Sequence, residues 1–125
     1  MLAFGIERSA STTLTTADLG ALHAAHDEVR AAPGPAEHRQ ADARLHLVLA
    51  TLSGSASLVE AVTRVQAAVH EMLLSIPVLG VNIEHSSAQH ATIVDAVEAG
   101  RPEQARRAME EHCDDTAALL RGLIR

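Results

Sequence analysis

Apolar residues recur at spacings of three and four along most of this chain, which is the pattern of one face of an α-helix. Leu58, Val62, Val65 and Val69 are one example. No run of Val, Ile or Thr alternates with polar residues over the length of a strand. The pattern therefore predicts an all-α fold.

Breaks in this pattern divide the chain into helices with short connections. Pro35 and Pro102 each suit the first turn of a helix, and Gly100 suits the left-handed residue after a helix end. Short connections make consecutive helices antiparallel, so we expect an antiparallel bundle of about six helices, the first one truncated. The expected helices cover residues 2–8, Thr15 or Thr16 to the stretch 31–35, Pro35 to the turn 53–55, Leu58 to Ile76 with loosening at Pro77 and Gly80, Ser86 or Ser87 to Gly100, and Pro102 to Leu123.

The composition agrees with this fold. With one Phe, no Trp and no Tyr among 125 residues, the core must consist of small aliphatic side chains, which favour closely packed helices over a sheet. A chain of this length predicts a single domain over residues 1–125.

The charge and the lack of targeting signals argue against nucleic acid and membranes as partners of these residues. The formal net charge is -6 and no run of basic residues occurs, so these residues should not grip nucleic acid. No apolar segment approaches the ~20 residues of a membrane span, and no secretion signal opens the chain. The single cysteine, Cys113, has no internal disulfide partner. We expect a cytoplasmic protein without a membrane partner.

Four side chains that can bind a metal fall on helix faces that should turn toward the core: Asp42, His46, His90 and His112. Asp42 and His46 are four residues apart, which places them on one face of one helix. His90 and His112 are equally far from Arg101, on either side of it. At ~1.5 Å rise per residue, both rings would lie roughly 16 Å from that turn and face each other.

One carboxylate and three imidazoles form a donor set that suits a divalent transition metal. Zinc is the ion we expect first, with nickel, manganese or iron as alternatives. A divalent ion with one carboxylate ligand keeps a positive charge, so a small carboxylate could replace water on it. The residues thus predict a metal-dependent sensor of a small organic acid, not an enzyme.

The alternatives are ordinary core histidines or a metal-dependent enzyme. Eight histidines make chance pairs common, so a dimerisation bundle with hydrogen-bonded core histidines explains the same pattern. An enzyme needs a further acid or base beside the metal, and only Asp42 lies clearly on a core face. The remaining polar candidates are assigned ordinary roles: His23, His38, His70 and His85 as structural or surface residues, Cys113 as a small core or boundary residue, and Glu110, Glu111, Asp114 and Asp115 as an exposed acidic face.

Two segments resemble the FCD domain, the effector-binding C-terminal domain of GntR-type (FadR-like) transcription regulators. They are "ADARLHLVLATLSGSASL" at 41–58 and "QHATIVDAVEAGRPEQARRAMEEH" at 89–112, and the resemblance covers about residues 15–125. It implies that Asp42, His46, His90 and His112 are the metal ligands. Leu45 stands where the family usually has an aromatic residue, and Ser55 or its neighbour stands where Asn is common.

The resemblance also implies partners. It implies a small carboxylate effector, a homodimer, and contact with DNA only through a winged-helix domain, which these 125 residues lack. We therefore expect either a fragment of a longer regulator or a free-standing sensor. Arg8 is the candidate for the arginine that family members place on their first helix to hold a carboxylate. His26, which shares a core face, is a second candidate for effector binding.

Overall fold

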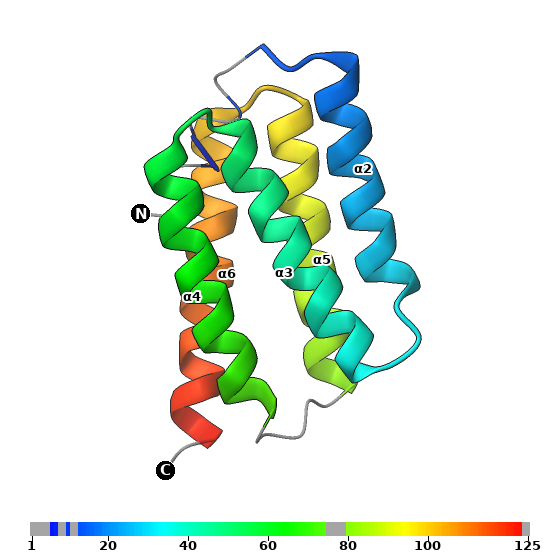
Figure 1. Cartoon of the computed structure of the whole chain (residues 1–125), viewed down its shortest axis with the longest axis vertical. Coiled ribbons are helices and arrows are strands. Elements are labelled where there is room, and N and C mark those ends of the chain that lie inside the picture. Colours follow the sequence, from blue (N-terminus) through cyan, green and yellow to red (C-terminus); the bar gives the residue numbers. More distant parts are fainter. Residues whose placement is uncertain (1–5, 8–9, 11–12, 75–79, 124–125) are drawn as a thin grey trace.

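The structure is a computed structural model that describes residues 6–7, 10, 13–74 and 80–123. Its helices are α2 (Thr16–Ala31), α3 (Pro35–Leu52), α4 (Ala56–Leu74), α5 (Gly80–Glu98) and α6 (Pro102–Leu123) (Figure 1). None of the described residues lies in a strand, so the prediction of an all-α bundle is confirmed.

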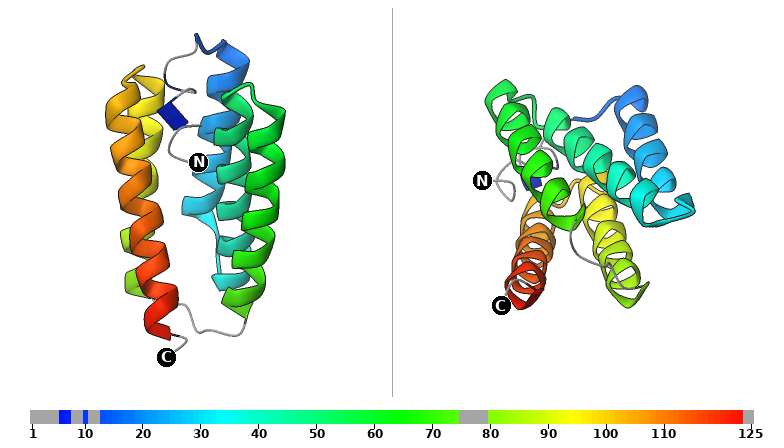
Figure 2. Two further views of the ribbon diagram at one scale, coloured as in Figure 1. Left: turned by 90° about the vertical axis from the view of Figure 1, so that its left-hand side faces the viewer. Right: turned by 60° about the horizontal axis from the view of Figure 1, so that its bottom comes forward.

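The helices form two layers. Helices α2, α3 and α4 follow one another in the first layer, and α5 and α6 pair as a hairpin in the second (Figure 2). Helix α2 packs against both α3 and α5, so it joins the layers along one side. On the other side, α4 packs against α3 and makes no close backbone approach to α6.

The local sequence sets the start of α2. The Thr15 hydroxyl accepts a hydrogen bond from the backbone N–H of Asp18, and the Asp18 carboxylate accepts one from the N–H of Thr15. This reciprocal capping box satisfies two donors that a helix start leaves free. Of the two threonines considered from the sequence, Thr15 is the cap.

The turn between α3 and α4 is built from serines. Ser53 is buried, and its hydroxyl donates to the carbonyl of Ala50. The hydroxyl of Ser55 accepts from the N–H of Leu58 and so caps α4. Ser55 thus does here what an Asn side chain could also do as a cap, and the helix start remains satisfied.

The turn between α5 and α6 fixes how the second layer is paired. Gly100 has a φ of +67°, and the N–H of Arg101 donates to the carbonyl of Ala96 at 2.9 Å. This is the glycine-ended helix stop predicted from the sequence. Pro102 then begins α6, which runs back along α5.

Helix α5 begins earlier than the sequence predicted. It starts at Gly80, so the prediction of a start at Ser86 or Ser87 was wrong, and both serines lie inside the helix. Serine costs an exposed helix only a few tenths of a kcal/mol, and no proline or glycine interrupts the chain after Gly80. The helix therefore extends back to that glycine.

Two other expected boundaries fall at the edge of the described residues. Ile6 and Glu7 are helical, within the short helix expected over residues 2–8, but Arg8 lies outside the described residues. Helix α4 is described to Leu74, and the expected end at Ile76 lies outside them too.

The main core lies between the two layers of the bundle. It contains residues of α2, α3, α5 and α6, and Leu45, Ile93 and Met109 within it are completely buried. Leu45 thus fills its place in the core without an aromatic ring. A smaller cluster of Ala50, Leu58 and Val62 holds α4 to α3.

Part of the apolar face of α4 is not buried, contrary to the prediction. Val65 is 51% exposed and Met72 is 38% exposed. The reason is that, among the described helices, α4 packs only against α3, so none of them covers the second half of its predicted stripe.

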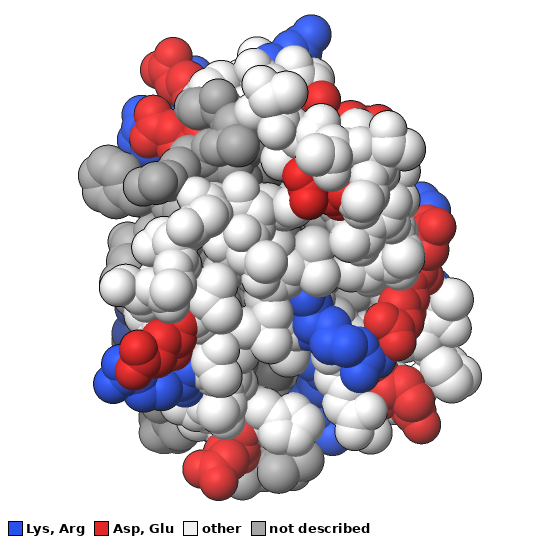
Figure 3. Space-filling view, turned by 45° about the horizontal axis from the view of Figure 1, so that its top comes forward, with Lys and Arg blue, Asp and Glu red and all other residues white. Residues whose placement is uncertain are grey.

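The surface carries short-range ion pairs. Basic and acidic groups lie beside one another in several places on the face in Figure 3. The ion pairs of the described residues include Arg44–Glu28, which joins α3 to α2, and Arg107–Glu103 within α6. Among the described residues, no helix has the length and apolar character that crossing a bilayer requires.

Candidate metal centre

The four predicted ligands meet at one point between the layers. Asp42 and His46 come from α3, His90 from α5 and His112 from α6, and one donor atom of each lies within 4.8 Å of the others. The ring centroids of His90 and His112 are 4.8 Å apart. The hairpin therefore aligns these two rings as their equal distance from Arg101 predicted.

The donor atoms are spaced as ligands of one ion are. Asp42 Oδ1 lies 2.9 Å from His90 Nε2 and 3.5 Å from His46 Nε2, and the Nε2 atoms of His46 and His112 are 3.4 Å apart. Donors at ~2.0–2.1 Å from a tetrahedral zinc ion stand about 3.3–3.4 Å from one another. No large rearrangement of side chains is needed to share a cation.

Several of these polar atoms lack a hydrogen bond although they are buried. They are Asp42 Oδ1, His46 Nδ1 and both ring nitrogens of His90. His90 Nε2 and Asp42 Oδ1 lie 2.9 Å apart but do not meet hydrogen-bond geometry. Leaving such a group without a partner costs about 1–3 kcal/mol. A bound cation would recover that cost for Asp42 Oδ1 and His90 Nε2, the two of these atoms that face the cluster.

Burial and mutual contact keep the site in a form that can bind a cation. Burial lowers the pKa of His112 from 6.5 to about 3, and His46 and His90 oppose a further positive charge there. Burial opposes ionisation of Asp42, but the His46 and His90 rings outweigh it and hold the pKa of this carboxyl well below 3.8. At neutral pH His112 thus offers a lone pair and Asp42 a negative charge.

A hydrogen-bond chain that the sequence did not reveal supports His112 from behind. His112 Nδ1 lies 2.7 Å from Gln89 Oε1, and Gln89 Nε2 donates to Asp115 Oδ2 at 2.7 Å. His85 Nε2 lies 2.9 Å from the same Asp115 oxygen. The chain runs from the buried site to the exposed edge of the α5–α6 hairpin.

The chemistry of this chain determines the tautomer of His112. The ionised carboxylate of Asp115 only accepts hydrogen bonds, so the amide nitrogen of Gln89 must face it. The amide oxygen of Gln89 then faces His112 and accepts its Nδ1–H. As a result the Nε2 lone pair of His112 points to the cluster, as metal-bound histidines require.

A cavity of about 720 Å³ opens on one side of the cluster. Asp42, His46 and His112 line it, together with residues of α3, α4, α5 and α6. The cluster separates this cavity from the main core, since His90 precedes the core residue Ile93 and His112 follows Met109. Most of the lining is apolar, with Val65, Val69 and Leu119 among it, and exposed parts of α4 form its outer wall.

The other residues singled out from the sequence lie in various places. His26 is buried on α2 with its Nε2 unpaired, but it does not line this cavity, so its role in effector binding remains an untested prediction. Arg8 lies outside the described residues. His38 and Cys113 both line the cavity. Asp115, assigned to a solvated acidic face, is indeed half exposed, yet it also anchors the chain behind His112.

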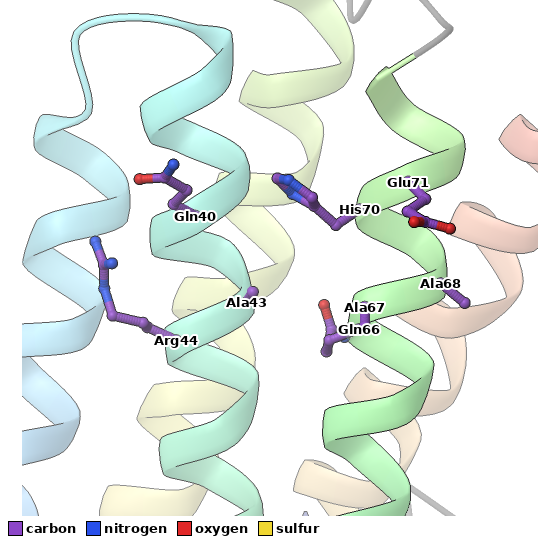
Figure 4. A pocket seen from close by; sticks show the side chains of 8 residues that line it. All are labelled: Gln40, Ala43, Arg44, Gln66, Ala67, Ala68, His70 and Glu71. Carbon is purple, nitrogen blue, oxygen red and sulfur yellow. The ribbon is translucent and has the colours of Figure 1, made fainter.

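A second hollow, of about 710 Å³, lies between α3 and α4 on the outside of the first layer (Figure 4). Gln40, Arg44, Gln66 and His70 are among its lining residues. It is separate from the four-residue cluster, none of whose members lines it.

Comparison with protein families identifies the domain type of this chain. A family model described as the FCD domain matches residues 4–115, which is most of the chain. No curated protein matches the chain. The matched residues include all four members of the cluster.

Proposed function

The chain belongs to the FCD domain family, and on this premise we propose that it is a metal-dependent sensor of a small carboxylate within a GntR-type transcription regulator. The resemblance found in the sequence is thereby confirmed, and FCD domains are the effector-binding parts of such regulators. The metal, the carboxylate and the regulatory output are the proposed parts.

The observation that carries the metal proposal is the state of His90. This ring is 1% exposed, and neither of its nitrogens has a hydrogen-bond partner. Three other donors surround it within ligand distance. A cation would satisfy His90 Nε2 and Asp42 Oδ1 together, whereas in a bundle of packing histidines these two atoms, 2.9 Å apart, would be expected to hydrogen-bond to each other; their state favours a shared cation over the dimerisation alternative.

Each group has a defined part in the proposal. Asp42, His46, His90 and His112 would hold the ion, and Gln89 orients His112. The ion would supply a positive centre at the wall of the cavity, to which the carboxylate of an effector binds. We assign the site to binding because the FCD domain is the effector-binding part of its regulators.

Elemental analysis tests the proposal directly. The protein is purified without a metal-affinity tag or chelator and compared with His90→Ala and His112→Ala. His23→Ala is the matched control, because His23 is half exposed and pairs with Glu98 away from the cluster. We expect about one transition-metal ion per chain in the wild type and control and loss of it in both cluster variants. Equal metal content in all four proteins would reject the proposal.

The regulatory part has a separate test. We propose that the chain acts as a homodimer and that DNA contact belongs to a winged-helix domain joined to it. Native mass spectrometry of the metal-loaded protein measures the oligomeric state and any acid that copurifies. A monomer at all concentrations would contradict the dimer without affecting the metal site.

A further inference from the structure

One arginine differs from the others in the structure. Most described arginines pair with a carboxylate, and Arg101 and Arg121, which do not, are exposed. Arg39 is partly buried and makes no ion pair or hydrogen bond with any described residue. In a chain with more acidic than basic residues, an arginine that is both partly buried and unpaired requires an explanation.

Arg39 faces the same cavity as the metal cluster. It lies three residues before Asp42 on α3, so both side chains occupy one face of the helix about 4.5 Å apart along its axis. Both line the cavity of about 720 Å³. The Nε atom of Arg39 is buried and has no hydrogen-bond acceptor.

The carboxylates of the cavity wall do not satisfy Arg39. Asp42 is directed toward His46 and His90, and Asp115 accepts from Gln89 and pairs with His85. A guanidinium group that loses water without gaining an acceptor is costly, and a carboxylate that binds it with both oxygens is its best-matched partner. A carboxylate in the cavity would supply the acceptor that Arg39 Nε lacks.

We propose that Arg39 binds a second anionic group of the effector, so that the cavity selects small dicarboxylates over monocarboxylates. This inference rests on the proposed function, because the first carboxylate is the one bound at the metal. A divalent ion with Asp42 as its only charged ligand keeps one positive charge, and Arg39 adds another. A compact dianion neutralises both, whereas a monocarboxylate leaves Arg39 unpaired.

Matched acid pairs test this on the Zn²⁺-loaded protein. Isothermal titration calorimetry compares malonate with propionate, succinate with butyrate, and glutarate with valerate, because each pair has the same number of carbons. For at least one pair we expect the dicarboxylate to bind about tenfold or more tightly, the effect of one charge-assisted bidentate contact.

The variants separate Arg39 from other causes. In Arg39→Gln the dissociation constant of the dicarboxylate should come within about twofold of that of its monocarboxylate partner. Arg39→Lys keeps the charge but cannot bind both carboxylate oxygens as a guanidinium does, so it should retain part of the preference. Arg44→Gln is the matched control, because Arg44 lies on the same helix but extends toward α2, where it pairs with Glu28 (Figure 4). It should keep the wild-type preference.

Two results would overturn the inference. One is a wild-type protein that binds Zn²⁺ but shows no preference for the dicarboxylate in any pair. The other is an Arg39→Gln variant that retains the full preference while holding as much Zn²⁺ as the wild type. Metal content, measured in each protein, identifies the failure of the metal site itself: a wild type that takes up no Zn²⁺ removes the proposed function and this inference together.

Discussion

Replacing Gln89 by Leu should weaken metal binding although Gln89 is not a ligand. Its amide oxygen accepts the Nδ1–H of His112 at 2.7 Å, and its amide nitrogen is held by Asp115. Leucine has a similar size but no polar atoms, so it removes both hydrogen bonds and leaves the neighbouring packing in place. The proton of His112 is then free to move to Nε2, the nitrogen that faces the cluster.

The magnitude follows from the geometry. His112 is 5% exposed, so water cannot easily replace the lost acceptor. Loss of a hydrogen-bond partner behind a metal-bound histidine typically reduces metal affinity 10–100-fold, which is about 1.4–2.7 kcal/mol. Loss of a buried neutral hydrogen bond on its own costs a similar ~1–3 kcal/mol when one partner stays unsatisfied. We therefore expect a dissociation constant for Zn²⁺ raised by about one to two powers of ten.

A competition titration measures this affinity. Metal-free protein is titrated with Zn²⁺ in the presence of a chromophoric chelator of known affinity, at fixed pH and ionic strength. Gln104→Leu on α6 is the matched control, because Gln104 is an exposed glutamine and makes no hydrogen bond with a described side chain. Urea denaturation of the metal-free proteins shows how much of any change comes from folding.

The reasoning would fail if Gln89→Leu bound Zn²⁺ as tightly as the wild type while His112→Ala did not. In that case the hydrogen bond would not control the orientation or tautomer of His112. A loss of affinity equal to that of Gln104→Leu would point to the same conclusion.

Three further predictions concern stability. A chelator should lower the free energy of unfolding of the as-purified protein by about 2.7 kcal/mol where free metal had been at 100 times its dissociation constant, and a melting temperature unchanged by chelator would contradict a bound ion. Gly100→Ala should destabilise the protein by about 1 kcal/mol in urea denaturation, because Gly100 has φ +67°, whereas Gly20→Ala, within α2 and facing open space, should stabilise it slightly; equal effects would contradict this account. Burial lowers the pKa of His26 below 6.5, so the unfolded chain binds more protons and the metal-free protein loses stability as pH falls below about 6.5. His26→Leu should reduce this loss between pH 7.5 and 5.5, and an unchanged pH dependence would show that His26 is not responsible.

The fold could be predicted because its determinants are local. The apolar spacing, Thr15 with Asp18, Pro35, Gly100 and Pro102 each act within a few residues, and each stands where the structure needs it. The predicted start of α5 at Ser86 or Ser87 was wrong because it relied on a local signal, a serine, that is ambiguous. A serine within a helix and a serine at its start look alike in sequence. The structure distinguishes them here, because the helix runs without a break from Gly80 to Glu98.

The position of the cluster could also be predicted, because a short hairpin converts equal sequence distance into spatial proximity. The groups around it could not. Gln89 contacts His112, and Asp115 joins it, across two helices whose relative rotation the sequence does not specify. The spacing of Gln89 four residues after His85 and of Asp115 three after His112 was the available signal. Arg39 gave no signal beyond its place one turn before Asp42, since its lack of a partner is visible only in three dimensions.

Helices α5 and α6 are packed into the core near Gly100 and line a cavity beyond the cluster, and this arrangement determines which helices a ligand would contact. Near Gly100, core side chains of α5 and α6 pack against the first layer. Beyond the cluster, a cavity lies between α3, α4, α5 and α6. The four donors of the cluster lie between these two regions, and Asp42, His46 and His112 line the cavity. A ligand that filled the cavity would touch both layers at once, because its walls come from α3 and α4 on one side and from α5 and α6 on the other.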